Sequence, residues 1–219
     1  MHGSTTGTKI IRKKRGQRDS NASRAAILQA ALNEFSTAGY EGARVDRIAE
    51  KAGVSKPLLY DYYGDKDDLY AAALREAYVQ IREAEQELSL EELAPREAIH
   101  ELIVFTVNHF RRRPWFITML NTENLRGGTT ITKLPDRHEI QSKLLLALEH
   151  VLERGKADGL FHRDISPVRL YLIIASLCYF PVSNRFTLAA IFDLSWGDDE
   201  YRQHAETVAD IVNTWLAAQ

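Results

Sequence analysis

Two short helical segments joined by a glycine turn constrain this chain more than any other feature. In the first, residues 45–52, the apolar side chains recur at a spacing that puts them on one face of a helix. Gly53 can take the positive φ that ends such a helix, and Ser55 is a good N-cap for the next one. That second helix is expected to run to about Tyr62, and Gly64 closes it. Two short helices so close together match the helix-turn-helix unit of DNA-binding proteins.

The charge is distributed unevenly along the 219 residues. The net charge is −2, but the chain up to Gly64 carries 11 basic and 6 acidic side chains, a net charge of +5, which leaves −7 for the remainder. A basic head on an acidic body indicates that only one end meets a polyanion. Charge alone leaves open the alternative that the basic stretch from Lys9 to Arg18 is a solvated tail.

Cysteine content and hydropathy indicate the compartment. The single cysteine, Cys178, excludes a disulfide framework and a cysteine-based zinc site, and it fits a reducing environment. No apolar run reaches the roughly 18 residues that a membrane span needs. The most apolar stretch, residues 170–180, is followed by Pro181. We therefore expect no membrane association, no secretion signal and a cytoplasmic location.

The rest of the sequence predicts an all-α fold with about nine helices. No alternating strand pattern of useful length competes with the helical periodicity. Residues 1–20 are polar and basic and are expected to form a disordered arm, followed by a helix-turn-helix domain over 21–66 and a helical domain over 67–219. The expected helices span residues 22–39, 45–52, 55–62, 65–88, 95–112, 114–126, 136–157, 166–180 and 198–216.

The residues from Arg44 to Leu69 carry a recognisable pattern. They follow I-A-x-x-A-G-V-S-x-x-x-L-Y-x-Y-F-x-x-K-x-x-L, and the preceding helix has F-x-x-x-G-[YF]-x-x-[TA] at Phe35, Gly39 and Tyr40, with Ala43 last. Some fifteen positions agree in register, and the chain thereby resembles TetR-type transcriptional regulators over about residues 24–74. The resemblance implies a three-helix DNA-binding domain at the N-terminus and a larger helical domain for ligand binding and dimerisation.

The resemblance also implies which side chains face DNA. Leu58 stands where the family often has Thr, Ser or Ala, and Asp61 where a basic or aromatic residue is common, so Asp61 is not assigned. Lysines at such an interface release counterions, and tyrosine hydroxyls donate to phosphates. Tyr60 and Tyr62 have the alternative of packing under the preceding helix. The implied contacts are Lys56, Pro57, Leu58, Tyr60 and Tyr62 from the recognition helix, Arg44 and Val45 at the start of the helix before it, and Lys66 at the start of the fourth.

The acidic remainder is expected to dimerise and to bind a small organic effector. The resemblance implies that the last two long helices form a four-helix bundle with a second copy, and their apolar content agrees with this. Residues 121–128 and 183–186 resemble a branch of the family that responds to small aromatic or carboxylic compounds. Each candidate also has the alternative of a core or interface role. The candidate pocket residues are His109, Phe110, Trp115, Phe116, Asn121, Glu123, Asn124, Cys178, Asn184 and Arg185.

These patterns predict a repressor that leaves double-stranded operator DNA when its effector binds and shifts the fourth helix. The alternatives are a constitutive DNA-binding factor without an effector and a metal-responsive regulator using His162 and Asp164. An enzyme is not expected: the triplet at 162–164 has Arg169 where a kinase has its metal-binding Asn, and Gly127-Gly128 lacks the Lys of a phosphate loop. We expect neither a cofactor nor a bound metal.

Overall fold

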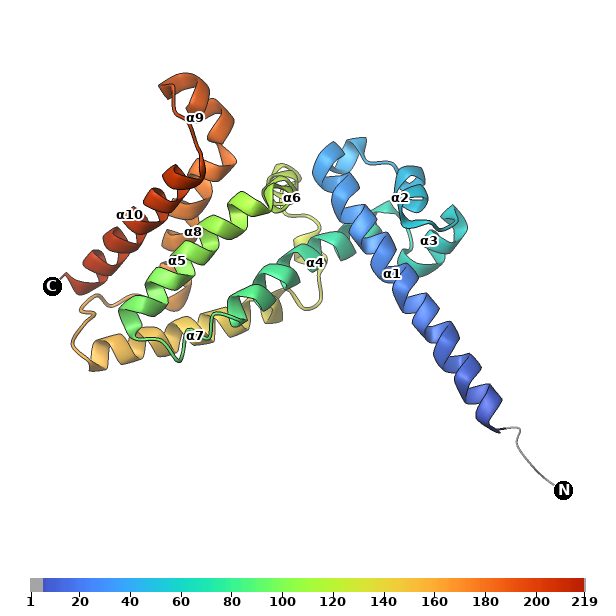
Figure 1. The fold of residues 1–219 in the computed structure, drawn as a ribbon, viewed down its shortest axis with the longest axis horizontal. Coiled ribbons are helices and arrows are strands. Elements are labelled where there is room, and N and C mark those ends of the chain that lie inside the picture. Colours follow the sequence, from blue (N-terminus) through green and yellow to red (C-terminus); the bar gives the residue numbers. More distant parts are fainter. Residues whose placement is uncertain (1–5, 219) are drawn as a thin grey trace. The chain divides into compact units, whose positions relative to one another are not determined.

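The computed structural model describes the backbone of residues 6–218 and the side chains of residues 20–141 and 143–218. This part of the chain contains ten α-helices, one short 3₁₀ helix and no strand, which confirms the all-α prediction (Figure 1). The helices are α1 (Thr6–Gly42), α2 (Val45–Ala52), α3 (Lys56–Tyr63), α4 (Lys66–Gln86), α5 (Pro95–Arg112), α6 (Pro114–Leu125), η1 (Ile131–Lys133), α7 (Arg137–Ala157), α8 (Pro167–Ser183), α9 (Arg185–Phe192) and α10 (Asp198–Ala217).

Local sequence signals set the ends of the short helices. Gly53 closes α2 in the left-handed conformation, with φ 67° and ψ 29°, and the Ser55 hydroxyl accepts from the Leu58 N–H at the start of α3. Asp65 and Asp68 cap α4 reciprocally, because each carboxylate accepts from the backbone N–H of the other residue. A Cβ added at Gly64 would lie 2.4 Å from Asp68 Oδ2, so this position needs glycine.

The first helix differs most from its prediction. Helix α1 begins at Thr6, so residues 6–20, which we expected to be a disordered arm, are helical here, while residues 1–5 lie outside the described part. Residues 6–20 contain no proline and several Lys, Arg and Gln, which favour helix. At the other end, Gly39 has φ 67° and ψ −179°, so the backbone kinks where the sequence placed the helix end.

One helix, α9, was not predicted. The sequence placed a single apolar helix over residues 166–180, but α8 continues through Pro181 to Ser183 and α9 follows it. Asn184 separates the two, with φ −104° and ψ 12°. The eight residues of α9, apolar except for Arg185 and Thr187, gave no sign of a separate helix, and the described part of the chain therefore has one helix more than expected.

The chain forms two compact units. The first comprises residues up to Ala77 together with Thr118–Leu134, and the second comprises Tyr78–Ile117 together with the residues from Pro135 onward. Helices α4 and α6 therefore each contribute to both units, whereas the sequence placed a single boundary between residues 66 and 67. The first unit has a core from α1, α2, α3 and α4 that includes the fully buried Ile27, Phe35, Ile48, Leu59 and Leu69.

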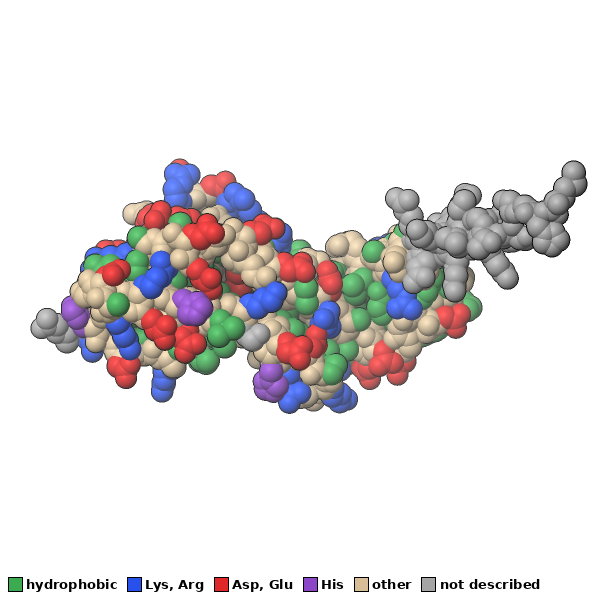
Figure 2. All heavy atoms as spheres, turned by 90° about the horizontal axis from the view of Figure 1, so that it is seen from below, with side chains coloured by type: hydrophobic (Ala, Val, Ile, Leu, Met, Phe, Trp, Pro, Cys, Tyr) green, Lys and Arg blue, Asp and Glu red, His purple; other side chains and the backbone are tan. Residues whose placement is uncertain are grey.

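The second unit is built around α5, which packs against α7, α8 and α10. Its buried apolar side chains include Ile99, Ile103, Leu148, Leu170 and Val212. On the face drawn in Figure 2, acidic and basic side chains are interspersed over this unit. No single helix of the described chain is long and apolar enough to cross a membrane; α8 and α9 reach that length and composition only as a pair, with a 65° bend between them.

Candidate DNA-binding interface and candidate effector site

Helix α3 has one buried and one exposed face. Leu59 is fully buried, whereas Lys56 and Pro57 are exposed and Tyr60 keeps 40% of its surface in contact with solvent. Leu58, another of the five contacts predicted on this helix, is half-buried. Because Leu59 fixes the helix on the core, the face with Lys56, Pro57 and Tyr60 points away from it. This is the arrangement that a recognition helix requires.

The Lys56 ammonium already has a partner in the free protein. It lies 2.7 Å from the Asp46 carboxylate of α2 and 6.0 Å from the centre of the Tyr60 ring. The hydrogen bond and charge of Asp46 raise the pKa of Lys56, so the ammonium stays charged. Both side chains are exposed, and an exposed pair of this kind is easily exchanged for a phosphate.

Tyr62 and Tyr63 hold α3 against α1. The Arg24 guanidinium lies 4.8 Å from the centre of the half-buried Tyr62 ring, and the Tyr63 hydroxyl donates to the Arg24 carbonyl at 2.9 Å. Tyr63 is itself half-buried. Tyr62 therefore has a partner within the protein, and its predicted contact with DNA stays a prediction.

The three remaining predicted contacts, Arg44, Val45 and Lys66, lie at the starts of α2 and α4. Arg44 is exposed and occupies the N-cap position of α2 without a side-chain capping hydrogen bond, while Val45 is half-buried as the first residue of that helix. Lys66 is half-buried, with its ammonium 3.4 Å from the Glu41 carbonyl and 4.8 Å from the centre of the Tyr40 ring. All eight predicted contacts thus lie in the first unit, and Arg44, Val45, Lys56 and Lys66 lie at the starts of helices, where backbone N–H groups favour anions.

A buried carboxylate that the sequence did not reveal positions α2. Glu34 of α1 is only 3% exposed, and it accepts from the Arg44 N–H at 3.3 Å and from the Lys51 ammonium at 2.9 Å. Arg47 lies 3.7 Å away. Burial raises the pKa of Glu34, but the hydrogen bonds from Lys51 and Arg44 and the nearby charges outweigh it and lower the pKa below its ordinary value. Glu34 thus caps α2 from a neighbouring helix.

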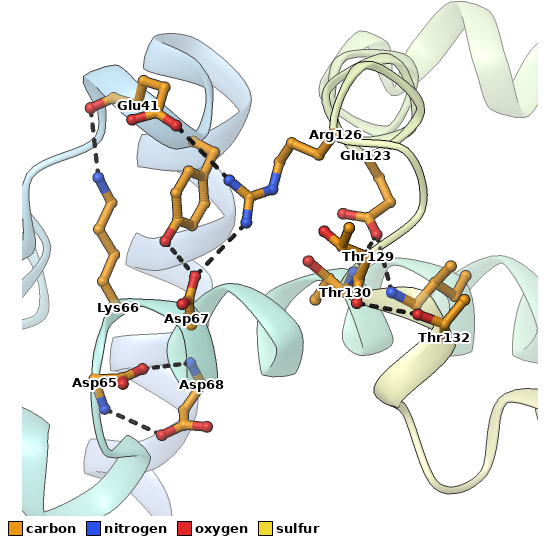
Figure 3. Close-up of polar contacts among 12 residues, drawn as sticks. Glu41, Asp65, Lys66, Asp67, Asp68, Glu123, Arg126, Thr129, Thr130 and Thr132 are labelled. Carbon is orange, nitrogen blue, oxygen red and sulfur yellow. Dashed lines mark hydrogen bonds and ion pairs between the residues drawn. The ribbon is translucent and has the colours of Figure 1, made fainter.

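Arg126, just after α6, binds the ends of α1 and α4 within the first unit (Figure 3). Its guanidinium carbon lies 3.5 Å from the centre of the Tyr40 ring, and its terminal nitrogens lie 3.8 Å from Glu41 and 3.6 Å from Asp67. The Tyr40 hydroxyl in turn donates to Asp67. Sequence reasoning missed this cluster because Arg126 is far in the sequence from all its partners.

Four of the predicted pocket residues come together in the second unit. His109, Phe110 and Phe116 are buried, with ring centres 5.5–6.2 Å apart, and the half-buried Trp115 adjoins Phe116 at 6.0 Å. Arg113 Nη1 lies 2.8 Å from His109 Nδ1. Burial, followed by the charges of Arg113 and Arg82, lowers the pKa of His109 to about 4, so the imidazole is neutral and Nδ1 accepts. These residues form an aromatic cluster.

The other six candidates do not join that cluster. Asn121 and Asn124 belong to the first unit, as does Glu123, which accepts from the N–H groups of Thr130 and Ile131 at 2.7 and 2.9 Å and so holds the loop after α6 (Figure 3). The remaining three have local partners: Cys178 is buried beside the Ile103 carbonyl, Asn184 donates to the Phe180 carbonyl, and Arg185 donates to the Val182 carbonyl.

A cavity of about 410 Å³ lies elsewhere in the second unit, between the end of α4, the connection to α5, and α7. None of the ten predicted pocket residues lines it. Its wall includes a buried ion pair, Arg82 and Glu85, each about 5% exposed or less, with Arg82 Nη1 2.7 Å from Glu85 Oε2. The volume falls in the range of small-molecule sites. No sequence signal pointed to these two residues, because charged residues on a helix usually face solvent.

The pair of residues considered for a metal has other partners. Asp164 lies 2.8 Å from the Lys156 ammonium, and the backbone N–H of His162 donates to the Leu216 carbonyl. Among the side chains of residues 20–141 and 143–218, no group of three or more His, Cys, Asp or Glu is placed to hold a metal ion.

Two family models match the chain. Residues 27–73 match the bacterial regulatory proteins of the tetR family, and residues 95–212 match the tetracyclin repressor-like C-terminal domain. The first match includes α2 and α3, and therefore the exposed face of α3. The second covers most of the second unit.

Relatives and solved structures agree with these matches. The HTH-type transcriptional repressor NicS of Pseudomonas putida is 35% identical over 190 residues, 86% of this chain and 90% of that protein. The repressor SCO4008 of Streptomyces coelicolor is 30% identical over 161 residues, 72% of this chain and 78% of that protein. A putative transcriptional regulator, SCO4942 of S. coelicolor, has the same fold, with a TM-score of 0.64 at 22% identity over 88% of this chain and 97% of its own.

Proposed function

Because this chain belongs to the TetR family of transcriptional regulators, we propose that it is a homodimeric repressor that a small organic effector releases from operator DNA. As a member of this family it is a DNA-binding regulator and not an enzyme. Repression, dimerisation and the effector response form the proposal, together with a cytoplasmic location beside the chromosome.

The observation that carries the proposal is the exposed face of α3. Lys56, Pro57 and Tyr60 face solvent from a helix that Leu59 anchors in the core, and Glu34 orients the helix before it. A helix held rigidly from behind can enter the major groove without losing further conformational entropy. The two relatives described above, each matched over more than two thirds of its length, are named as repressors, which favours repression over activation.

Dimerisation is supported by apolar side chains on the last two long helices. On α8, Val168, Leu172 and Phe180 are 49–58% exposed and recur at multiples of four residues, and on α10 Ile211 is 51% exposed. A soluble protein usually covers a stripe of this kind with a partner. Two subunits joined there would present two α3 helices to half-sites about 34–36 Å apart.

The effector response is supported by the cavity in the second unit. A constitutive DNA-binding factor needs no cavity, and a well-packed helical body would have favoured that alternative. The cavity of about 410 Å³ has room for a small organic molecule. For release, the effector must bind the DNA-incompetent conformation more tightly than the DNA-bound one.

DNA binding is tested with operators selected from a random duplex library by the full-length protein. Lys56→Ala should weaken binding to the selected duplex and lower the slope of log affinity against log salt by about one unit, because one phosphate contact is lost. Lys156→Ala removes an exposed lysine of the second unit and should change neither quantity. Equal salt slopes for the two variants would contradict the assignment of α3 as the recognition helix.

Dimerisation is tested by analytical ultracentrifugation at micromolar concentration. The wild-type chain should sediment as a dimer, and Leu172→Glu should sediment as a monomer because it places a charge in the middle of the α8 stripe. Leu125→Glu is the control, since Leu125 is 90% exposed at the end of α6 and belongs to neither α8 nor α10. A wild-type monomer would contradict the proposed dimer.

A further inference from the structure

The buried ion pair at the wall of the cavity is poorly satisfied. Arg82 Nη2 donates to the Tyr171 hydroxyl at 3.0 Å, but Arg82 Nε has no hydrogen-bond partner among the described residues. Arg82 Nη1 and Glu85 Oε2 are 2.7 Å apart without hydrogen-bond geometry. Buried polar groups are normally paired, so unpaired donors beside a cavity mark a place where a ligand can supply the acceptor.

The two members of the pair respond differently to an added charge. A guanidinium keeps its proton in a protein, so Arg82 stays positive whatever binds beside it. Glu85 can lose its charge by taking up a proton, and burial raises the pKa of Glu85 to about 7 although the nearby charge of Arg82 acts to lower it. An arriving anion is therefore accommodated by protonating Glu85, whereas an arriving cation meets an arginine that cannot adjust.

The rest of the cavity lining combines Lys143, His150, the two exposed carboxylates Glu91 and Glu92, and an apolar wall. The Lys143 ammonium of α7 lies 3.3 Å from the neutral Gln86 amide oxygen, so no carboxylate within the described chain is paired with it. Glu91 at the outer edge lies 3.3 Å from His150 and is exposed to solvent, which screens it. Leu90, Leu144 and Ala147 supply the apolar surface.

We propose that this cavity binds a small organic carboxylate, with its carboxylate group between Arg82 and Lys143 and its apolar body against Leu90, Leu144 and Ala147. The proposal rests on the proposed function, because the carboxylate is the effector that the repressor would sense. It replaces the aromatic cluster around His109 as the place where the effector binds.

The test uses three soluble probes of one shape and different charge: benzoate, benzamide and benzylamine. Calorimetric titration of the full-length protein should give benzoate a Kd about tenfold lower than that of benzamide, since the charge adds two charge-assisted hydrogen bonds. Benzylamine should bind more weakly than benzamide. Preference for benzylamine, equal affinity for benzoate and benzamide, or no binding by any probe would each overturn the proposal.

Two variants locate the binding without removing Arg82, whose loss could unfold the second unit. Lys143→Ala should raise the Kd of benzoate about fivefold and leave that of benzamide unchanged, because only the anion contacts the ammonium. Glu85→Gln should lower the Kd of benzoate at pH 8, since it removes the negative charge beside Arg82. Lys156→Ala is the control: Lys156 lies on α7, as Lys143 does, but does not line the cavity, so this variant should change the Kd of neither benzoate nor benzamide. Benzoate binding that ignores both Lys143→Ala and Glu85→Gln would place the probe elsewhere and overturn the proposal.

A DNA-binding assay separates this proposal from the function on which it rests. The selected duplex is titrated with protein in the presence and absence of saturating benzoate. Benzoate that binds with the predicted variant pattern but leaves the DNA affinity unchanged supports the carboxylate site and contradicts the effector response. Operator release by another compound, with no benzoate binding, supports the response and overturns the carboxylate site.

Discussion

Two buried glutamates, one in each unit, have opposite electrostatic environments. Glu34 and Glu85 are 3% and 4% exposed, and both lie on helices. Glu34 accepts from an N–H group and an ammonium and has Arg47 beside it, and its pKa is lowered. Glu85 faces Arg82 alone at 2.7 Å, and its pKa is raised to about 7. The number of donors around a buried carboxylate thus decides whether it is fixed as an anion or left able to take up a proton.

The difference matches the work proposed for each unit. A DNA-reading surface needs a fixed geometry, and a fully engaged Glu34 supplies it by capping α2. A ligand binds more tightly to groups that are still unpaired, because its binding then breaks no existing hydrogen bond of those groups. We therefore expect substitutions of the two carboxylates to differ in the size of their effect on the unfolding free energy and in how that effect depends on pH.

The largest expected effect is the pH dependence due to Glu85. Its folded pKa lies above the ordinary 4.5, so the folded state binds the extra proton, and the stabilisation present below pH 4.5 is lost as the pH rises through about 7. The loss amounts to about 3 kcal/mol. Urea unfolding should therefore give a smaller fall in unfolding free energy between pH 5 and pH 8 for Glu85→Gln than for the wild type, by that amount.

The control for this experiment is Glu83→Gln, an exposed position on the same helix. It should keep the wild-type pH dependence. If Glu85→Gln also keeps it, the carboxylate is ionised throughout this range and the contrast with Glu34 disappears.

Substitution of Glu34 should have a smaller effect that does not vary with pH over the same range. The pKa of Glu34 is lowered, so its stabilisation is complete above its ordinary pKa of 4.5 and is lost only as the pH falls below it. Glu34→Gln places an amide where Lys51 and the Arg44 N–H need an acceptor, and it should cost about 2 kcal/mol at both pH 5 and pH 8. Urea unfolding measures this loss, and the exposed Glu50→Gln should show none of it.

DNA affinity provides a second readout for Glu34. If this residue orients α2, Glu34→Gln should weaken binding to the selected duplex even at a temperature where the protein is fully folded. Unchanged affinity together with reduced stability would mean that Glu34 stabilises the unit without positioning its DNA-binding face.

Local and long-range features of this fold differ in how far the sequence could predict them. Gly53, Ser55 and Asp65 act on residues within three or four positions, so their helix-ending and capping roles could be predicted. The outward face of α3 was implied by the family resemblance, which also included the half-buried Leu58 and Tyr62. The partners of Glu34 lie 10 and 17 residues away, and those of Arg82 include Tyr171, 89 residues away. Nothing in a local pattern distinguishes such a charged residue from one that faces solvent.

The same limit explains the candidate pocket. His109, Phe110 and Phe116 were chosen because aromatic side chains on apolar helices are typical of a pocket wall, and the same property lets them fill space against one another. The cavity beside Arg82 depends on how α7 packs against the end of α4, which no single segment specifies.

Arg126 extends the comparison to a cation, with the smallest expected effect. Like Arg82 it lies beside carboxylates and its Nε has no hydrogen-bond partner among the described residues, but it is 26% exposed and has two acidic partners and an aromatic ring. Solvent screening keeps its contribution low, and Arg126→Met should reduce the unfolding free energy by about 1 kcal/mol. Methionine keeps the apolar contact with Tyr40 and removes the charge, so urea unfolding isolates the electrostatic part.

The position of Arg126 gives the substitution a second consequence. The segment 118–134 contains most of α6 and the loop after it, and Arg126 binds it to Tyr40 and Glu41 of α1 and to Asp67 of α4. Loss of the guanidinium should therefore expose the loop after α6 to protease. Cleavage near residues 127–134 should therefore be faster in Arg126→Met than in the exposed control Arg112→Met. Because Glu123 still holds Thr130 and Ile131, the increase should be modest. Equal cleavage rates would mean that Glu123 alone fixes the loop.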